Sequence, residues 1–74
     1  MLNFNGRHAA TQHFAPLFAY EHLREDLRPV SQACAEVAEL MVERLPDGPE
    51  LSAGLRKLLE AKDCFVRAAL AATP

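Results

Sequence analysis

The sequence predicts an all-α protein, an antiparallel helical hairpin with a short N-terminal lead-in segment that assembles as an oligomer. Two apolar patterns with spacings of three and four residues predict the helices, and a short break rich in proline and glycine separates them. The chain has 74 residues, and a domain of this size buries only about 60% of the surface of its unfolded chain. So small a core needs a disulfide, a metal or a partner. We expect the stabilising partner to be a further copy of the chain.

Composition removes several classes of protein. The two cysteines, Cys34 and Cys64, lie inside apolar helical patterns, which is typical of reduced thiols rather than of a disulfide framework. A net charge of −2 argues against duplex DNA or RNA as a partner. No uncharged stretch approaches the ~20 residues that a membrane span needs, and the first residues lack the apolar run of a secretory signal.

The chain divides into two parts by its pattern. Residues 1–17 are polar and mixed without periodicity, so we expect a flexible N-terminal arm. Residues 18–74 form the predicted hairpin domain, which opens on an aromatic and charged lead-in over 18–28.

The first long helix is predicted from Pro29 to Leu45, since proline is tolerated in the first turn of a helix. Apolar residues recur on one face of this helix, and that face is predicted to form its side of the core. The face comprises Val30, Cys34, Val37, Met41 and Leu45, and is widened by Ala33, Ala38 and Leu40.

A second helix is predicted from Pro49 to Ala71. Asp47 is a good N-cap and Glu50 completes the capping-box pattern, and the short loop requires antiparallel helices. The helix carries two apolar stripes, of which the first comprises Leu51, Leu55, Leu58, Phe65 and Ala69 and the second Leu59, Val66 and Leu70. One partner helix cannot cover both stripes, and this surplus predicts self-association.

The sequence shows no catalytic or metal-binding constellation. Neither Ser31 nor Ser52 has a histidine at local spacing. Three histidines, His8, His13 and His22, lack a cysteine or carboxylate partner at metal-ligand spacing, and the three glycines form no phosphate loop. We therefore expect no enzyme, no cofactor and no metal.

Aromatic residues precede the first helix in the pattern Phe18-x-Tyr20-x-His22. If this segment is extended, the three side chains point the same way. They then stack on a nucleotide base, or they plug the end of the hairpin or clamp a neighbouring subunit. The pattern alone favours the plug or the clamp over the stacking.

Basic residues are grouped on the second helix, at Arg56, Lys57, Lys62 and Arg67. They are interpreted either as a phosphate clamp or as a solvated face with ion pairs at helical spacing. Charge patterning alone favours the ion pairs.

Several of these motifs together resemble the hairpin domain of phage anti-CBASS and anti-Thoeris sponges. They are the Phe18-Ala-Tyr20-Glu-His-Leu23 lead-in, Leu27-x-Pro-Val-Ser31, Leu45-Pro46-x3-Glu50 and the block from Leu55 to Leu70 that contains Arg56-Lys57-Leu58-Leu59-Glu60-Ala61-Lys62-Asp63. The resemblance covers about residues 18–71. It implies a catalytically inert hexamer that binds cyclic nucleotide signals of bacterial immunity and withholds them from their effector, in the cytoplasm of the infected bacterial host.

Carried over residue by residue, the resemblance makes Tyr20 the residue that stacks on a base. Lys57 becomes the first candidate for phosphate, with Arg56, Lys62 and Arg67 behind it and with Phe18 and His22 beside the stacking residue. The expected partners are cyclic dinucleotides, with trinucleotides as a further class. A sponge for a cyclic ADP-ribose signal, and a structural helical oligomer or protein-binding adaptor without a ligand, are the alternatives.

Overall fold

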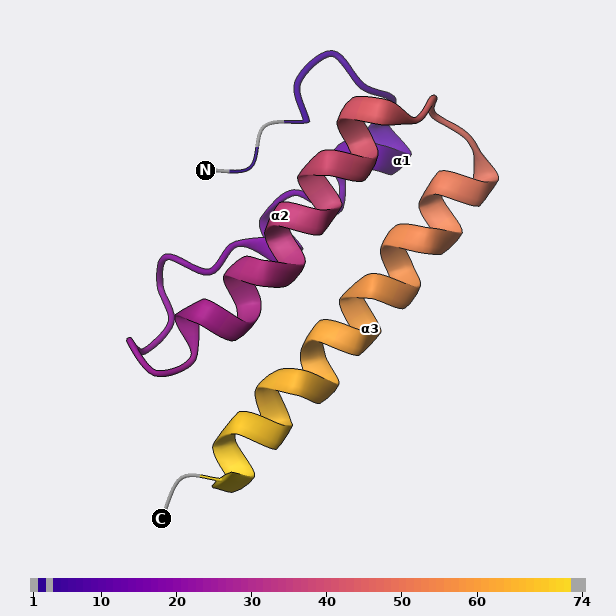
Figure 1. Cartoon of the computed structure of the whole chain (residues 1–74). Coiled ribbons are helices and arrows are strands. Elements are labelled where there is room, and N and C mark those ends of the chain that lie inside the picture. The colour runs from indigo at the N-terminus through magenta and orange to yellow at the C-terminus, as the bar shows by residue number, and fades with distance from the viewer. Residues whose placement is uncertain (1, 3, 73–74) are drawn as a thin grey trace.

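Two long antiparallel helices form the body of the molecule in the computed structural model, which describes residue 2 and residues 4–72 (Figure 1). They are α2 (Arg28–Arg44) and α3 (Pro49–Ala72). A short helix, α1 (Ala9–Gln12), and a 3-10 turn, η1 (Pro16–Phe18), precede them. The described residues contain no strand. The predicted all-α class is confirmed, and both long helices lie within one residue of their predicted bounds.

Prolines set the limits of the two long helices. Pro29 lies in the first turn of α2, where its missing N–H costs no helical hydrogen bond. Leu45 ends α2 in an extended conformation, with φ −119° and ψ 146°, because Pro46 disfavours the helical conformation of the residue before it. Pro49 then opens α3. The short loop between them turns the chain back on itself, as predicted.

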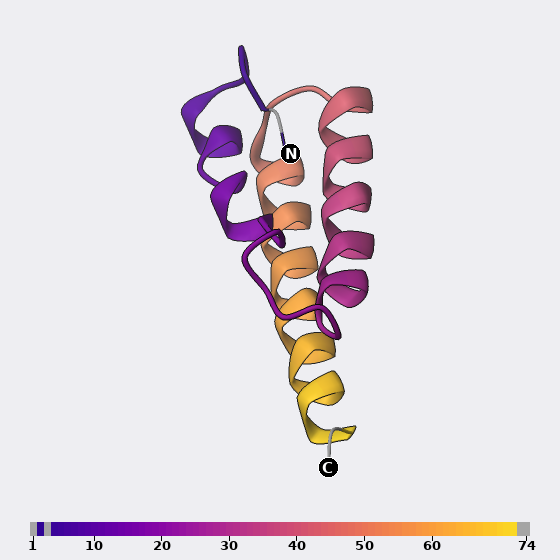
Figure 2. The ribbon, with the colours of Figure 1, turned by 90° about the vertical axis from the view of Figure 1, so that its left-hand side faces the viewer.

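The hydrophobic core draws on both long helices and on the part of the chain that precedes them. We call this part, residues 4–27, the N-terminal segment. Its buried members are Phe4, Phe14, Phe18, Ala35, Ala38, Val42, Leu51 and Leu55. The N-terminal segment therefore lies along one side of the hairpin (Figure 2), which differs from the flexible arm expected over residues 1–17. Three phenylalanines of this segment reach the core. Phe14 and Phe18 are four residues apart, which is a helical spacing, but they lie outside the two long periodic stretches that predict the helices.

Arg7 fixes the N-terminal segment to the end of α2. Its guanidinium donates hydrogen bonds to the backbone carbonyl of Val42 and, over 2.7 Å, to that of Leu45. Carbonyls in the last turn of a helix have no partner within the helix. Arg7 supplies partners for two of them, so the segment also completes the C-terminal end of α2.

The interhelical loop holds the N-terminal segment through Asp47. Its carboxylate accepts hydrogen bonds from the Thr11 hydroxyl (2.7 Å) and the His8 N–H (3.2 Å), and it forms an ion pair with Arg7 (3.2 Å). The predicted role of Asp47 as N-cap of α3 is therefore wrong, because its carboxylate is turned to the N-terminal segment. We call these contacts of Arg7, His8 and Thr11 with Asp47 the N-terminal clasp.

The buried side of α2 also differs from the predicted one. It consists largely of small residues, namely Ser31, Cys34, Ala35, Ala38 and Val42. Two members of the predicted core face, Val37 and Leu45, are instead 45% and 44% exposed. Small side chains on α2 leave room for both α3 and the phenylalanines of the N-terminal segment. The larger apolar residues of α2 are consequently turned toward an uncovered side of the hairpin.

The apolar stripes of α3 are covered only in part. Leu51 and Leu55 are buried, whereas Phe65 is 56% and Leu70 45% exposed. A single copy of the chain thus carries the apolar surplus that the sequence predicted on this helix.

Candidate functional site

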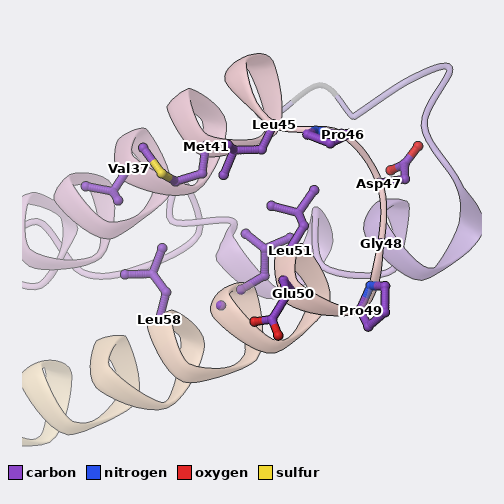
Figure 3. A pocket seen from close by; sticks show the side chains of 12 residues that line it. Val37, Met41, Leu45, Pro46, Asp47, Gly48, Pro49, Glu50, Leu51 and Leu58 are labelled. Atoms are coloured by element: carbon purple, nitrogen blue, oxygen red, sulfur yellow. The ribbon is translucent and has the colours of Figure 1, made fainter.

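A groove with a volume of about 500 Å³ lies between the C-terminal half of α2 and the N-terminal half of α3 (Figure 3). Val37 and Met41 line it from α2, and Leu51 and Leu58 line it from α3. The only ionisable residues in its lining are Asp47 and Glu50, at the end formed by the interhelical loop. A groove with an apolar wall and an acidic end suits apolar side chains and offers no positively charged group to bind a phosphate.

Tyr20 lies on a different side of the hairpin. Its side chain is partly exposed and packs against the core. A small cavity of about 100 Å³ beside it is lined also by Leu2, Ala35, Glu36 and Glu39. The two carboxylates make this neighbourhood unfavourable for a phosphate, although the tyrosine ring itself remains accessible.

The other two residues of the aromatic lead-in do not share the position of Tyr20. Phe18 is fully buried, at 0% exposure, and His22 is exposed. The expected alternation does not hold, because the segment is no extended strand: Phe18 ends the 3-10 turn, and a tight turn follows in which the Leu23 N–H donates to the Tyr20 carbonyl over 3.0 Å. Phe18 has no ring face to offer a ligand, and it is instead part of the core.

The predicted basic residues are dispersed around α3. Lys62 is largely covered, with 14% of its side chain exposed, and its Nζ lies 3.0 Å from Asp63 Oδ1. Arg67 donates a hydrogen bond to the Cys64 sulfur over 3.3 Å. Arg56 and Lys57 are exposed. These four side chains therefore form no single cluster.

One subunit does not bring Tyr20 and Lys57 together. Lys57 follows the groove-lining Gly54 by three residues and so lies at the edge of the groove side of α3. Tyr20 lies against Ala35, Glu36 and Glu39 of α2, and no basic residue lines the cavity beside it.

Nucleophiles and metal ligands are sparse in the described part of the chain. Burial raises the pKa of the Cys34 thiol, which lies inside the hairpin, while Cys64 is exposed. No group of three histidine, cysteine, aspartate or glutamate side chains is placed to hold a metal ion among the described residues. Within the same residues, no helix has the length and apolar character to cross a membrane.

Comparison with family models, characterised proteins and solved structures gave no match for this chain. The groove was not expected from the sequence, because the apolar spacing of Val37, Met41 and Leu45 predicts a core face. That spacing was nevertheless the one feature of the sequence that marks the groove. The N-terminal clasp was not expected either, because the pattern of Arg7, Thr11 and Asp47 gives no signal for it.

Proposed function

We propose that the protein is a catalytically inert sponge that binds cyclic oligonucleotide signals between subunits and withholds them from their effector. Cyclic dinucleotides are the first candidates, and cyclic trinucleotides and a cyclic ADP-ribose are further ones. The observation that carries the proposal is Tyr20, an aromatic side chain that is anchored against the core yet partly exposed. A ring held in this way can stack on a base with little loss of side-chain freedom, and such stacking contributes about 1–3 kcal/mol per base.

The phosphates of such a ligand need cations that Tyr20 does not have beside it. Glu36 and Glu39 line the adjoining cavity and disfavour a phosphate there. The exposed cations Arg56 and Lys57 belong to α3. Charge-assisted hydrogen bonds from a second copy would meet the phosphates. The two-fold symmetry of such a pair repeats each contact, so that two copies of the chain together offer two tyrosine rings and two sets of cations.

Calorimetric titration with a panel of cyclic dinucleotides, cyclic trinucleotides and a cyclic ADP-ribose tests the proposal. Tyr20→Phe keeps the ring and should bind like the wild type. Tyr20→Leu keeps the apolar contact with the core but loses the π face, so it should weaken binding by about 1–3 kcal/mol. Equal helicity of the variants by circular dichroism separates loss of stacking from loss of fold. A wild type that binds none of the panel would remove this function.

Release of the ligand tests sequestration against turnover. Bound compound, freed by heat denaturation and analysed by chromatography, should be unchanged. Linear nucleotide products would instead make the protein an enzyme.

A second candidate function is a helical oligomer or protein-binding adaptor without a small ligand. The apolar groove between α2 and α3 favours it, since that groove suits apolar side chains. Stable assembly together with no response to any member of the nucleotide panel would select this candidate.

A further inference from the structure

One long side of the hairpin remains uncovered by the chain's own residues. We call it the open face and define it by the groove together with the apolar positions that continue the groove's spacing along each helix. These are Val30, Val37, Met41 and Leu45 on α2, and Gly54, Leu58, Ala61 and Phe65 on α3. Spacings of three, four and seven residues place each set on one side of its helix.

The N-terminal segment does not cover this face. Its phenylalanines pack with the small residues of α2, and Tyr20 packs beside Ala35, Glu36 and Glu39. Figure 2 shows the segment along one side of the hairpin. Val37 and Phe65 are 45% and 56% exposed. The face thus leaves apolar side chains in contact with solvent, and burying apolar surface is worth roughly 25 cal/mol per Å².

Gly54 gives this face a shape that the single chain does not use. Glycine inside a helix is destabilising by roughly 0.5–1 kcal/mol relative to alanine. Nothing lies within 4 Å of the place where a Cβ of residue 54 would stand, so no contact within the subunit requires the glycine. A helix that approaches from outside would use this gap, since small residues allow close packing of helix backbones.

The charges beside the open face suit a second copy of the chain. A two-fold contact requires a surface that complements itself. The open face is apolar at its centre, and the exposed Glu50 and Lys57 flank it on α3 with opposite charges. Two such faces in antiparallel alignment can bring unlike charges together.

We propose that the open face binds the open face of a second copy about a two-fold axis, so that two hairpins form a four-helix arrangement with Gly54 at the close approach. This contact rests on the apolar strip and needs no nucleotide. The sponge function proposed above requires assembly, but the assignment of this face stands or falls separately.

Analytical ultracentrifugation of the full chain without nucleotide tests the proposal. Val37 and Leu40 give a matched pair, because both lie on α2 with similar exposures of 45% and 40% and only Val37 lines the groove. Val37→Lys should raise the dissociation constant of the pair by at least about tenfold, since it buries an unpaired charge in each copy. Leu40→Lys should leave it close to the wild-type value.

Gly54→Leu provides the second test, because a Cβ at residue 54 meets nothing within 4 Å in a single copy. Helicity should be kept or raised while association weakens, and Ala53→Leu, the matched control outside the groove lining, should keep association. A wild type that stays monomeric at 100 μM, as an order-of-magnitude limit, would overturn the proposal. So would Val37→Lys and Gly54→Leu associating as tightly as their controls. If the protein assembles but binds no nucleotide, the open face remains the proposed contact between copies and only the proposed sponge function is lost.

Discussion

The hydroxyl of Thr11 donates a hydrogen bond to Oδ1 of Asp47 across 2.7 Å and so joins two positions 36 residues apart. Thr11 is buried, at 1% exposure, on α1. Asp47 belongs to the loop between α2 and α3 and is exposed. This contact closes the N-terminal clasp, and with it the N-terminal segment becomes a structural part of the hairpin.

Thr11→Val should lower the free energy of unfolding by about 1 kcal/mol, because valine keeps the shape of threonine and loses only the hydrogen bond. Urea denaturation followed by circular dichroism measures the change. Asp47→Ala supplies the control: in that background Thr11→Val should cost less, since residues in contact do not contribute additively. Equal costs in both backgrounds would show that the two side chains are not coupled.

Acid should open the clasp. The hydrogen bond from Thr11, followed by those from the His8 N–H and Arg7, holds the pKa of the Asp47 carboxyl below its ordinary value. A group whose pKa is lowered by folding binds fewer protons in the folded state than in the unfolded one. It therefore adds stability above its unfolded pKa, and that stability is lost as the pH falls through the folded value.

Thermal unfolding between pH 6 and pH 2 checks this acid dependence. The melting temperature of the wild type should fall below about pH 4, where an ordinary aspartate begins to titrate. Asp47→Asn should show a lower melting temperature at neutral pH and a shallower decline in acid. An unchanged acid slope in Asp47→Asn would assign the decline to other carboxyls, such as Glu21, whose own pKa is lowered chiefly by backbone hydrogen bonds.

Phe14→Ala should unfold a large part of the protein. The side chain is 3% exposed within the core, and removing a buried phenylalanine costs about 3–5 kcal/mol, a large share of the stability of a small domain. Leu17→Ala, at a 40% exposed position of the same segment, is the control and should have little effect. The measurement is denaturant unfolding at one protein concentration. If Phe14→Ala unfolds like the wild type, residues 1–17 do not contribute to the stability of the hairpin, as expected for a flexible arm.

Helix limits could be predicted closely from the sequence because they depend on local chemistry. Pro29 fits the first turn of α2, Pro46 forces Leu45 out of the helix, and Pro49 opens α3. Each of these effects acts within a few residues, so it can be predicted without knowledge of the tertiary structure.

The side of α2 that becomes buried could not be predicted in this way. Periodicity ranks faces by the size of their apolar residues, and it selected the face of Val37 and Met41. Packing instead centres on Ala35, together with Ala38 from the margin of the predicted face, because small residues let α2 lie against two neighbours at once. One of those neighbours contains Phe14, which lies outside the two long periodic stretches of the sequence.

The candidate site could be predicted only in part, because the sequence carries no direct information on tertiary packing. An assumed extended segment placed Phe18 beside Tyr20, whereas the 3-10 turn carries Phe18 into the core. A residue list cannot show that Tyr20 and Lys57 face different sides of one hairpin. Their separation follows only from the packing of the N-terminal segment on α2.

Lys57→Ala should weaken the binding of a cyclic dinucleotide roughly tenfold at low salt and less at high salt, because ions screen the contact between an ammonium group and a phosphate. Calorimetric titration at two salt concentrations measures both values. Arg56→Ala is the matched control, since Arg56 is the exposed neighbouring cation on α3 and points to a different side of the helix. Sedimentation of each variant first establishes that assembly is intact, because Lys57 also flanks the open face. If Arg56→Ala shows the salt-dependent loss and Lys57→Ala does not, the phosphate contact belongs to Arg56. If neither variant changes the affinity while Tyr20→Leu does, the cations of α3 take no part in the site.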